Sequence, residues 1–87
     1  MTARQFTLDD LKRILVECAG ADDAVDLDGD ILDQGFEEIG YESLAILETG
    51  GRIENEYDVI IDESVLSVHV TPRELITAVN ELLTVSA

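Results

Sequence analysis

Apolar residues recur at intervals of three and four in three parts of the chain, a spacing typical of helices that bury one face. The first part begins after Thr7 and stops at Gly20, the second runs from Ser43 to Tyr57, and the third begins after Thr71. We therefore predict three principal helices packed around one core.

The first and last helices carry capping signals. Thr7 and Asp10 form a capping box, with Asp in place of the preferred Glu, and Gly20 is a C-terminal stop. The last helix opens on Thr-Pro-Arg-Glu at Thr71, which places an N-cap, a first-turn Pro and a Glu at their favoured positions. The core positions predicted for these two helices are Leu8, Leu11, Ile14, Leu15 and Cys18, and Leu75, Ile76, Val79, Leu82 and Leu83.

The middle helix has two apolar edges and an unusual pair of glycines. The edges are Leu44, Leu47 and Gly51, and Ile46, Gly50, Ile53 and Tyr57; the polar face is Glu48, Arg52, Asn55 and Glu56. A glycine inside a helix costs about 1 kcal/mol relative to alanine. The pair Gly50-Gly51 therefore indicates a helix weakened or bent in its middle, the close approach of a neighbouring helix, or room for a ligand.

The segments between the helices complete the predicted fold. Residues 21–42 are rich in Asp and Gly and are predicted to form a long loop. Its apolar anchors over the core are Val25, Leu27, Ile31, Leu32, Phe36 and Ile39. Residues 59–61 are compatible with a short strand, but no partner strand is visible, and we predict a short helix over 62–68. The fold class is all-α, a bundle of three main helices plus one short helix with a long first loop, in a single domain spanning 1–87.

Charge and composition limit the classes of partner that we expect the chain to bind. The 87 residues include 20 acids against five Lys and Arg, a formal net charge of -15, and 46% of them are hydrophobic, enough for a core. Nucleic acids and anionic membrane surfaces repel such a chain, so we expect protein partners with basic patches, or cations. The single Cys18 excludes an internal disulfide and fits a reducing compartment. Without a secretion signal or an apolar run of about 20 residues, the chain is expected to be cytoplasmic.

The acidic loop matches part of a calcium-binding EF-hand loop. Counted from Asp26, acids occupy positions 1, 3 and 5, and Glu37 occupies position 12. Position 6, which needs Gly for a sharp turn, is Ile31, and position 8, normally apolar, is Asp33. We assign no metal ligands, and an acidic calcium-binding or adaptor domain stays open as an alternative function.

Side chains suited to catalysis are scarce. Nucleophilic catalysis needs a nucleophile, a base and an orienting group, but the chain has one Cys and one His. Cys18 falls on the apolar stripe of the first helix, and His69 precedes a helix cap, where a turn is expected. The sequence has no Gly-rich phosphate loop and no Cys/His metal spacing. We therefore predict that the protein is not an enzyme.

The serine that opens the middle helix carries the functional prediction. A Ser at such a position is often only a helix cap, but Ser43 lies within GYESLAILE. That stretch resembles the attachment motif of acyl carrier proteins, Gly-x-Asp-Ser-Leu at the start of their second helix. LKRILVECAG, DLDGDILDQGFEEIGYESLA, ETGGRIENEY and TPRELITAVN are similar to the freestanding carriers of bacterial type II (aromatic) polyketide synthases.

This resemblance implies a covalent cofactor. In the family, a 4'-phosphopantetheine arm from coenzyme A is joined through a phosphodiester to the serine that corresponds to Ser43. Malonyl groups and growing polyketide chains travel as thioesters on the thiol of that arm. A phosphodiester suits a helix N-terminus, which offers free N–H groups and the positive end of the helix dipole. The acid before the serine is usually Asp in the family and is Glu42 here, which moves the carboxylate outward by one methylene.

The family also implies partners. They are a phosphopantetheinyl transferase, a malonyl transferase, a ketosynthase with its chain-length factor, and ketoreductase or cyclase subunits. Glu42, Leu44, Glu48 and Glu54 are the predicted docking residues, because an acidic surface speeds encounter with basic sites; Leu44 is also compatible with core packing. We expect a monomer. A carrier for fatty-acid or peptide synthesis is a further alternative that differs only in its partners.

Overall fold

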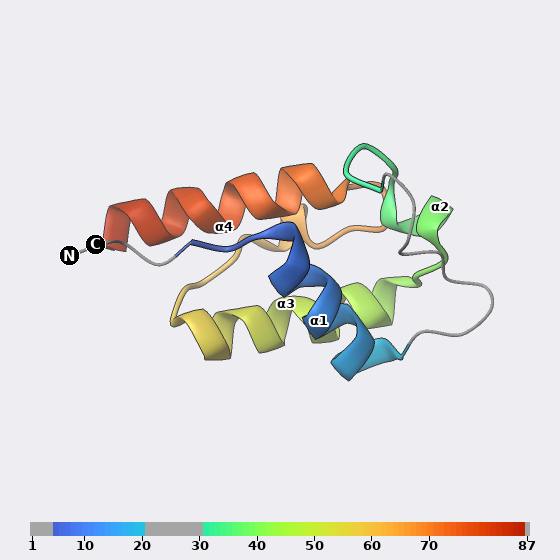
Figure 1. The fold of residues 1–87 in the computed structure, drawn as a ribbon, viewed down its shortest axis with the longest axis horizontal. Helices are drawn as coiled ribbons and strands as arrows, with labels where there is room; N and C mark the ends of the chain where they lie inside the picture. Colours follow the sequence, from blue (N-terminus) through green and yellow to red (C-terminus); the bar gives the residue numbers. More distant parts are fainter. Residues whose placement is uncertain (1–4, 21–30, 87) are drawn as a thin grey trace.

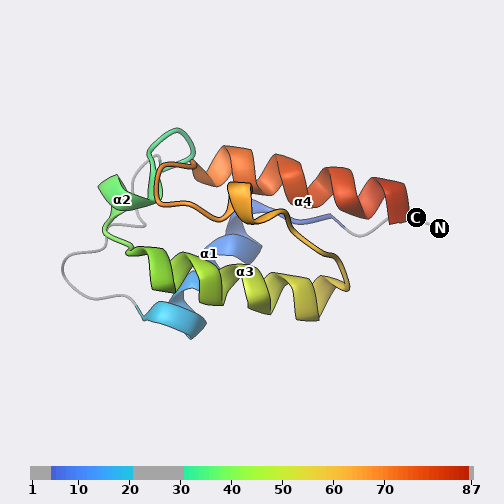
Figure 2. The same ribbon diagram turned by 180° about the vertical axis from the view of Figure 1, so that it is seen from behind.

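A computed structural model of the chain describes residues 5–20 and 31–86, and Figure 1 shows its fold. Its elements are three principal helices and two short turns: α1 (Leu8–Ala19), α2 (Phe36–Ile39), α3 (Ser43–Tyr57), the 3-10 turn η1 (Glu63–Val65) and α4 (Pro72–Ser86). In both ribbon views α3 and α4 run in the same direction, with α1 on one face of the pair and η1 on the other (Figures 1 and 2). The segment after α3 therefore runs back along the molecule, through η1, before α4 begins.

The three principal helices confirm the prediction, and the connections correct it. Phe36–Ile39 form a helical turn where a loop was predicted, because one turn brings the buried side chains of Phe36 and Ile39 to the same side. Residues 21–30, with the anchors Val25 and Leu27, lie outside the described residues. The short helix predicted over 62–68 is the shorter turn η1, and the described part of the chain contains no strand, including at 59–61.

The predicted caps are present at both helices. The Asp10 N–H donates to Thr7 Oγ1 (3.2 Å), and the Thr7 N–H donates to Asp10 Oδ2 (3.1 Å). Partial burial acts to raise the pKa of Asp10, but the hydrogen bonds from Thr7 outweigh it and leave that pKa below its usual value. Thr71 and Glu74 exchange the same pair of bonds at the start of α4 (3.2 and 3.3 Å). Gly20 ends α1 with a φ of 76°.

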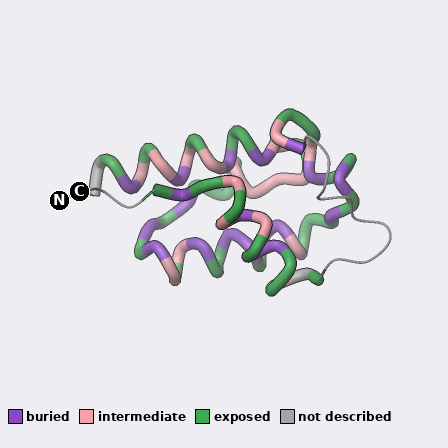
Figure 3. The backbone as a smooth tube through the Cα atoms, viewed as in Figure 1, coloured by how far each residue is buried: buried purple, intermediate pink, exposed green. Residues whose placement is uncertain are grey.

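One hydrophobic core joins all the elements, and Figure 3 shows buried positions recurring along each helix. Its fully buried aliphatic residues are Leu11, Ile14, Leu15, Ile31, Ile46, Ile53, Leu75 and Val79. The ring of Phe6 meets that of Tyr57 edge to face, with centroids 5.2 Å apart. Cys18 packs against this core from a partly buried position, as its place on the apolar stripe predicted. None of the described helices has both the length and the apolar character needed to cross a bilayer.

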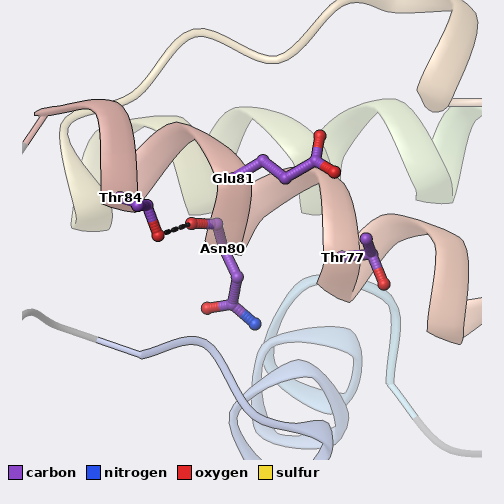
Figure 4. Close-up of a pocket in the computed structure, with 4 residues that line it drawn as sticks. All are labelled: Thr77, Asn80, Glu81 and Thr84. Atoms are coloured by element: carbon purple, nitrogen blue, oxygen red, sulfur yellow. Dashed lines mark hydrogen bonds between the residues drawn. The ribbon is translucent and has the colours of Figure 1, made fainter.

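Polar contacts connect α1 to α3, and α4 to the segment before α1. Arg13 of α1 pairs with Glu56 of α3 (2.6 Å), and Arg52 of α3 pairs with Glu17 of α1 (2.6 Å). On α4, the Asn80 carboxamide accepts a hydrogen bond from the Phe6 N–H (2.7 Å) and donates one to the Phe6 carbonyl oxygen (2.9 Å). Figure 4 shows Asn80 pointing toward the N-terminal segment, whereas Glu81 on the same helix points away from it.

Candidate functional site

The chain reaches Ser43 through a turn that its neighbours hold in place. Gly40 ends α2 in the left-handed region (φ 118°), where a side chain would be strained, and its N–H donates to the carbonyl oxygens of Phe36 and Glu37. The next residue, Tyr41, is buried, and its N–H also donates to the Phe36 oxygen (2.9 Å). A buried anchor two residues before Ser43, and a helix directly after it, fix the serine at the surface.

Hydrogen bonds also connect this turn to the segment before α4. The N–H groups of Phe36 and Glu37 donate to the carbonyl oxygens of Val70 (3.1 Å) and Val68 (3.0 Å). Close by, Arg73 donates to both carboxylate oxygens of Asp33 (2.7 and 3.2 Å), and these hydrogen bonds lower the pKa of Asp33. The residues that lead to Ser43 are thus supported from the far end of the sequence.

Ser43 itself is exposed and is the first residue of α3. The N-cap is Glu42, whose backbone is extended (φ -95°, ψ 167°) and whose carboxylate makes no capping hydrogen bond. The Ser43 hydroxyl makes no hydrogen bond with any described residue. The interpretation of Ser43 as a simple helix cap is therefore wrong. Its oxygen is exposed at the surface, and no side chain caps the first N–H groups of α3.

An apolar surface follows Ser43 along α3. Leu44 is 67% exposed and Leu47 is 48% exposed, and at one and four positions after Ser43 both border the serine. The core-packing alternative for Leu44 is thus wrong. Gly51, on the same edge, is also exposed, so the edge that the sequence grouped as apolar lies at the surface rather than in the core. Sequence reasoning missed Leu47 as a surface residue, since its spacing equals that of a core position.

Two of the three predicted docking acids share this surface. Glu42 precedes Ser43, Glu48 lies four residues after Leu44, and both are exposed. Glu54 is different: it is partly buried, and its carboxylate accepts a hydrogen bond from the Ile61 N–H (2.8 Å). That bond closes the end of α3 against the segment that follows, which gives Glu54 a role in the fold.

The glycine pair separates into two different environments. A methyl group on Gly50 would lie 2.6 Å from both terminal carbons of Leu66, so the side chain of Leu66 fills the space that this glycine leaves. The neighbour that approaches is therefore the connection after η1, not another helix. At Gly51, a methyl group would meet nothing within 4 Å. Close approach thus explains Gly50 only.

The remaining reactive side chains do not gather near Ser43. His69 is exposed in the turn before α4, as predicted, and its ring nitrogen lies 3.6 Å from the Glu37 carboxylate. Glu37, the last position of the calcium-loop hypothesis, lies in α2, and the positions from Asp26 to Asp30 lie outside the described residues. Among the residues that the structure describes, no three His, Cys, Asp or Glu side chains form a group suited to a metal ion.

Comparisons with known proteins agree with this geometry. Residues 9–79 match the family model described as a phosphopantetheine attachment site. The chain is 58% identical to the monensin polyketide synthase acyl carrier protein of Streptomyces virginiae, over 95% of this chain and 93% of that one. It is 51% identical to the actinorhodin polyketide synthase acyl carrier protein of Streptomyces coelicolor, over 98% and 99%. The solution structure of malonyl acyl carrier protein from the actinorhodin synthase superimposes with a TM-score of 0.83 at 49% identity, covering 99% of this chain and 100% of that one.

Proposed function

Because the chain belongs to the acyl carrier proteins of bacterial type II polyketide synthases, we propose that Ser43 is the residue that bears its covalent 4'-phosphopantetheine. The carrier holds malonyl and growing polyketide chains as thioesters on this arm and moves them among the synthase enzymes. The observation that supports Ser43 is its exposed, unbonded hydroxyl at the start of α3, within the motif Gly-x-acid-Ser-Leu.

Attachment is one substitution at phosphorus. The Ser43 oxygen would bond to the phosphorus that carries the pantetheine and give its proton to a base of the transferase, while the P–O bond of the pyrophosphate breaks and the nucleotide part of coenzyme A leaves with that oxygen. The new phosphodiester is an anion, and the uncapped N–H groups at the start of α3 stabilise it. When bound, the arm supplies a thiol on which acyl groups form thioesters. The chain itself positions that thiol and presents it, which agrees with the scarcity of reactive side chains.

Docking is proposed at the surface beside Ser43. Leu44 and Leu47 offer an exposed apolar contact, and Glu42 and Glu48 flank it with negative charge. Basic partner sites are attracted to such a surface and leave it quickly, because the attraction is screened by salt. The partners proposed are the phosphopantetheinyl transferase, the malonyl transferase, the ketosynthase with its chain-length factor, and ketoreductase or cyclase subunits. Glu54 stays a weaker docking prediction, because its carboxylate is already hydrogen-bonded to Ile61.

The cellular location and the oligomeric state are part of the proposal. A single cysteine, Cys18, fits a reducing compartment, so we propose that the carrier acts in the cytoplasm. A net charge of -15 on 87 residues opposes self-association, which supports a monomer.

The decisive experiment is intact mass after incubation with coenzyme A and a phosphopantetheinyl transferase. The parent is expected to gain the mass of one arm, and Ser43→Ala is expected to gain none while unfolding at an unchanged temperature. Ser64→Ala, which removes another exposed hydroxyl, is the matched control and should load like the parent. An arm on the Ser43→Ala variant would show that another residue is the attachment site.

A further inference from the structure

Two hollows that share Leu82 lie between α4 and the segment that follows α3, and together they are called the groove here. One part, about 280 Å³, is lined by Ile61, Asp62, Val65, Ala78, Glu81 and Leu82. A second part, about 310 Å³, is lined by Asp58, Val59 and Ile60 and shares Leu82 with the first. The 15 residues of α3 correspond to roughly 22 Å of helix, so the part lined by Asp58, Val59 and Ile60, directly after α3, is well separated from the serine.

The groove carries an exposed aliphatic side chain that the fold does not use. Ile60 is 84% exposed, the highest value among the large hydrophobic residues of the described chain. Its neighbours Val59 and Ile61 are buried, at 8% and 4%. Alternation along this extended segment therefore turns Ile60 outward while the residues beside it hold the backbone on the core. A single exposed isoleucine is ordinary, but this one lies at the edge of the groove, beside the apolar part that Ile61, Val65 and Leu82 line.

The rim of the groove is acidic. Asp58, Asp62 and Glu81 line it, and none of them takes part in an ion pair within the described residues. The three described arginines pair elsewhere, Arg13 and Arg52 with acids of α1 and α3 and Arg73 with Asp33. An apolar floor with an uncompensated negative rim is complementary to an apolar stripe flanked by cations.

We propose that this groove binds a basic amphipathic helix of a protein partner. The apolar stripe of that helix lies on Ile60 and Leu82, and its Lys or Arg side chains meet Asp58, Asp62 and Glu81. A second copy of this chain is a poor occupant, since each copy carries a charge of -15. The contact does not involve the arm, so a partner held in the groove leaves the surface around Ser43 free for an enzyme. One subunit can then retain the carrier while others act on its cargo.

The test uses the holo protein, labelled with 15N, and the synthetic peptide LKKLLKLLKKLLKL. A peptide of the same composition, reordered to remove helical amphipathicity, is the control ligand. Amide shifts are expected to concentrate at residues 58–65 and 78–82. The double variant Ile60→Ser, Glu81→Lys should weaken the binding of the peptide by about tenfold, because it removes an apolar anchor and reverses a rim charge. The matched variant Val16→Ser, Asp9→Lys removes an exposed aliphatic side chain and reverses an exposed acid on α1, outside both the groove and the docking surface, and should alter affinity less than about twofold.

Several outcomes would overturn the proposal. Equal weakening by both double variants, or equal binding of both peptides, would show general attraction to an acidic chain. Shifts centred on the start of α3 would place the contact at the docking surface instead. If sedimentation showed dimers, and Ile60→Ser dispersed them, a second copy of the chain would be the occupant. If acylation of the arm shifted the amide signals of residues 58–65 without peptide, the cargo would be the occupant. Loading of the parent and of Ser43→Ala by the transferase is measured in parallel, because a parent that gains no arm would contradict the proposed attachment site without bearing on the groove.

Discussion

Leu47 and Ile53 are both aliphatic residues of α3, yet Leu47 is 48% exposed and Ile53 is fully buried. Two hydroxyl residues of the same helix divide in the same way, with Ser43 exposed at its start and Thr49 completely buried six residues later. One face of α3 thus belongs to the core, and the other presents the serine and its surroundings. Residue type does not distinguish the two faces; position on the helix does.

The consecutive glycines sharpen this contrast. Gly50 lies on the core face, where Leu66 fills the space above it, and Gly51 lies on the exposed face with open space around it. The difference teaches that stability and carrier activity can be separated on a single helix. Changes on the buried face should act on unfolding, and changes on the exposed face should act on transfer to and from partners.

Matched truncation of the two aliphatic residues should produce the largest contrast. Ile53→Ala removes a fully buried side chain and is expected to lower the free energy of unfolding by about 2–5 kcal/mol. Leu47→Ala removes a half-exposed side chain and should change it by no more than about 0.5 kcal/mol, while slowing acyl transfer to a synthase partner. Urea unfolding of both variants and a transfer assay of Leu47→Ala measure the two effects. Comparable destabilisation by the two substitutions would mean that Leu47 belongs to the core.

Substitution of the two glycines by alanine should change the free energy of unfolding in opposite directions. At Gly50, alanine forces Leu66 out of its place, at a cost of about 1–3 kcal/mol for overpacking, and the helix-propensity gain of about 1 kcal/mol offsets only part of it. Gly50→Ala should therefore destabilise the protein by up to about 2 kcal/mol. Gly51→Ala meets open space and should stabilise it by about 0.4–1 kcal/mol. The check is thermal unfolding of the two single variants, and stabilisation by both would show that Leu66 moves aside freely.

The sequence predicted the helices, and the place of Ser43 at the start of α3, because those signals are local. Caps at Thr7 and Thr71 and the apolar periodicity locate helix ends and faces without reference to the rest of the chain. Periodicity shows only that Leu44, Leu47 and Gly51 share an edge, however, and not whether a neighbour covers that edge. The helical turn α2 likewise depends on backbone hydrogen-bond partners more than thirty residues away in the sequence, among them Val68.

The roles of Glu54 and Gly50 were hidden for the same reason. Glu54 looked like one more surface acid, but its carboxylate meets the Ile61 N–H only once the chain has turned after α3. The partner of Gly50 is Leu66, in the connection after η1, which no local pattern relates to the middle of α3. Long-range packing decides both, so the sequence supports the attachment site more firmly than the docking surface.

Thr49 offers a smaller test of the buried face. It is 0% exposed, and its hydroxyl has no hydrogen-bond partner among residues 5–20 and 31–86. A buried hydroxyl without a partner costs about 1–3 kcal/mol in lost hydration. Thr49→Val keeps the branched shape and removes the hydroxyl, so it should stabilise the protein by about 1 kcal/mol and leave loading at Ser43 unchanged. Unfolding in urea measures the change; a loss of stability would show that the hydroxyl bonds within the folded protein after all.

The smallest effect is expected on the exposed face, at Glu48. Its carboxylate lies beside Leu44 and Leu47 and has no ion-pair partner among the described residues. Glu48→Lys should therefore leave unfolding unchanged within about 0.5 kcal/mol and slow transfer to a basic partner by up to about fivefold, equivalent to about 1 kcal/mol. Since salt screens exposed charges, the difference from the parent should shrink as ionic strength rises. Asp9→Lys on α1 makes the same change of charge outside both the surface beside Ser43 and the groove, and serves as the control. Transfer that is slowed equally by both substitutions would mean that net charge governs encounter, and that the surface beside Ser43 has no special part in it.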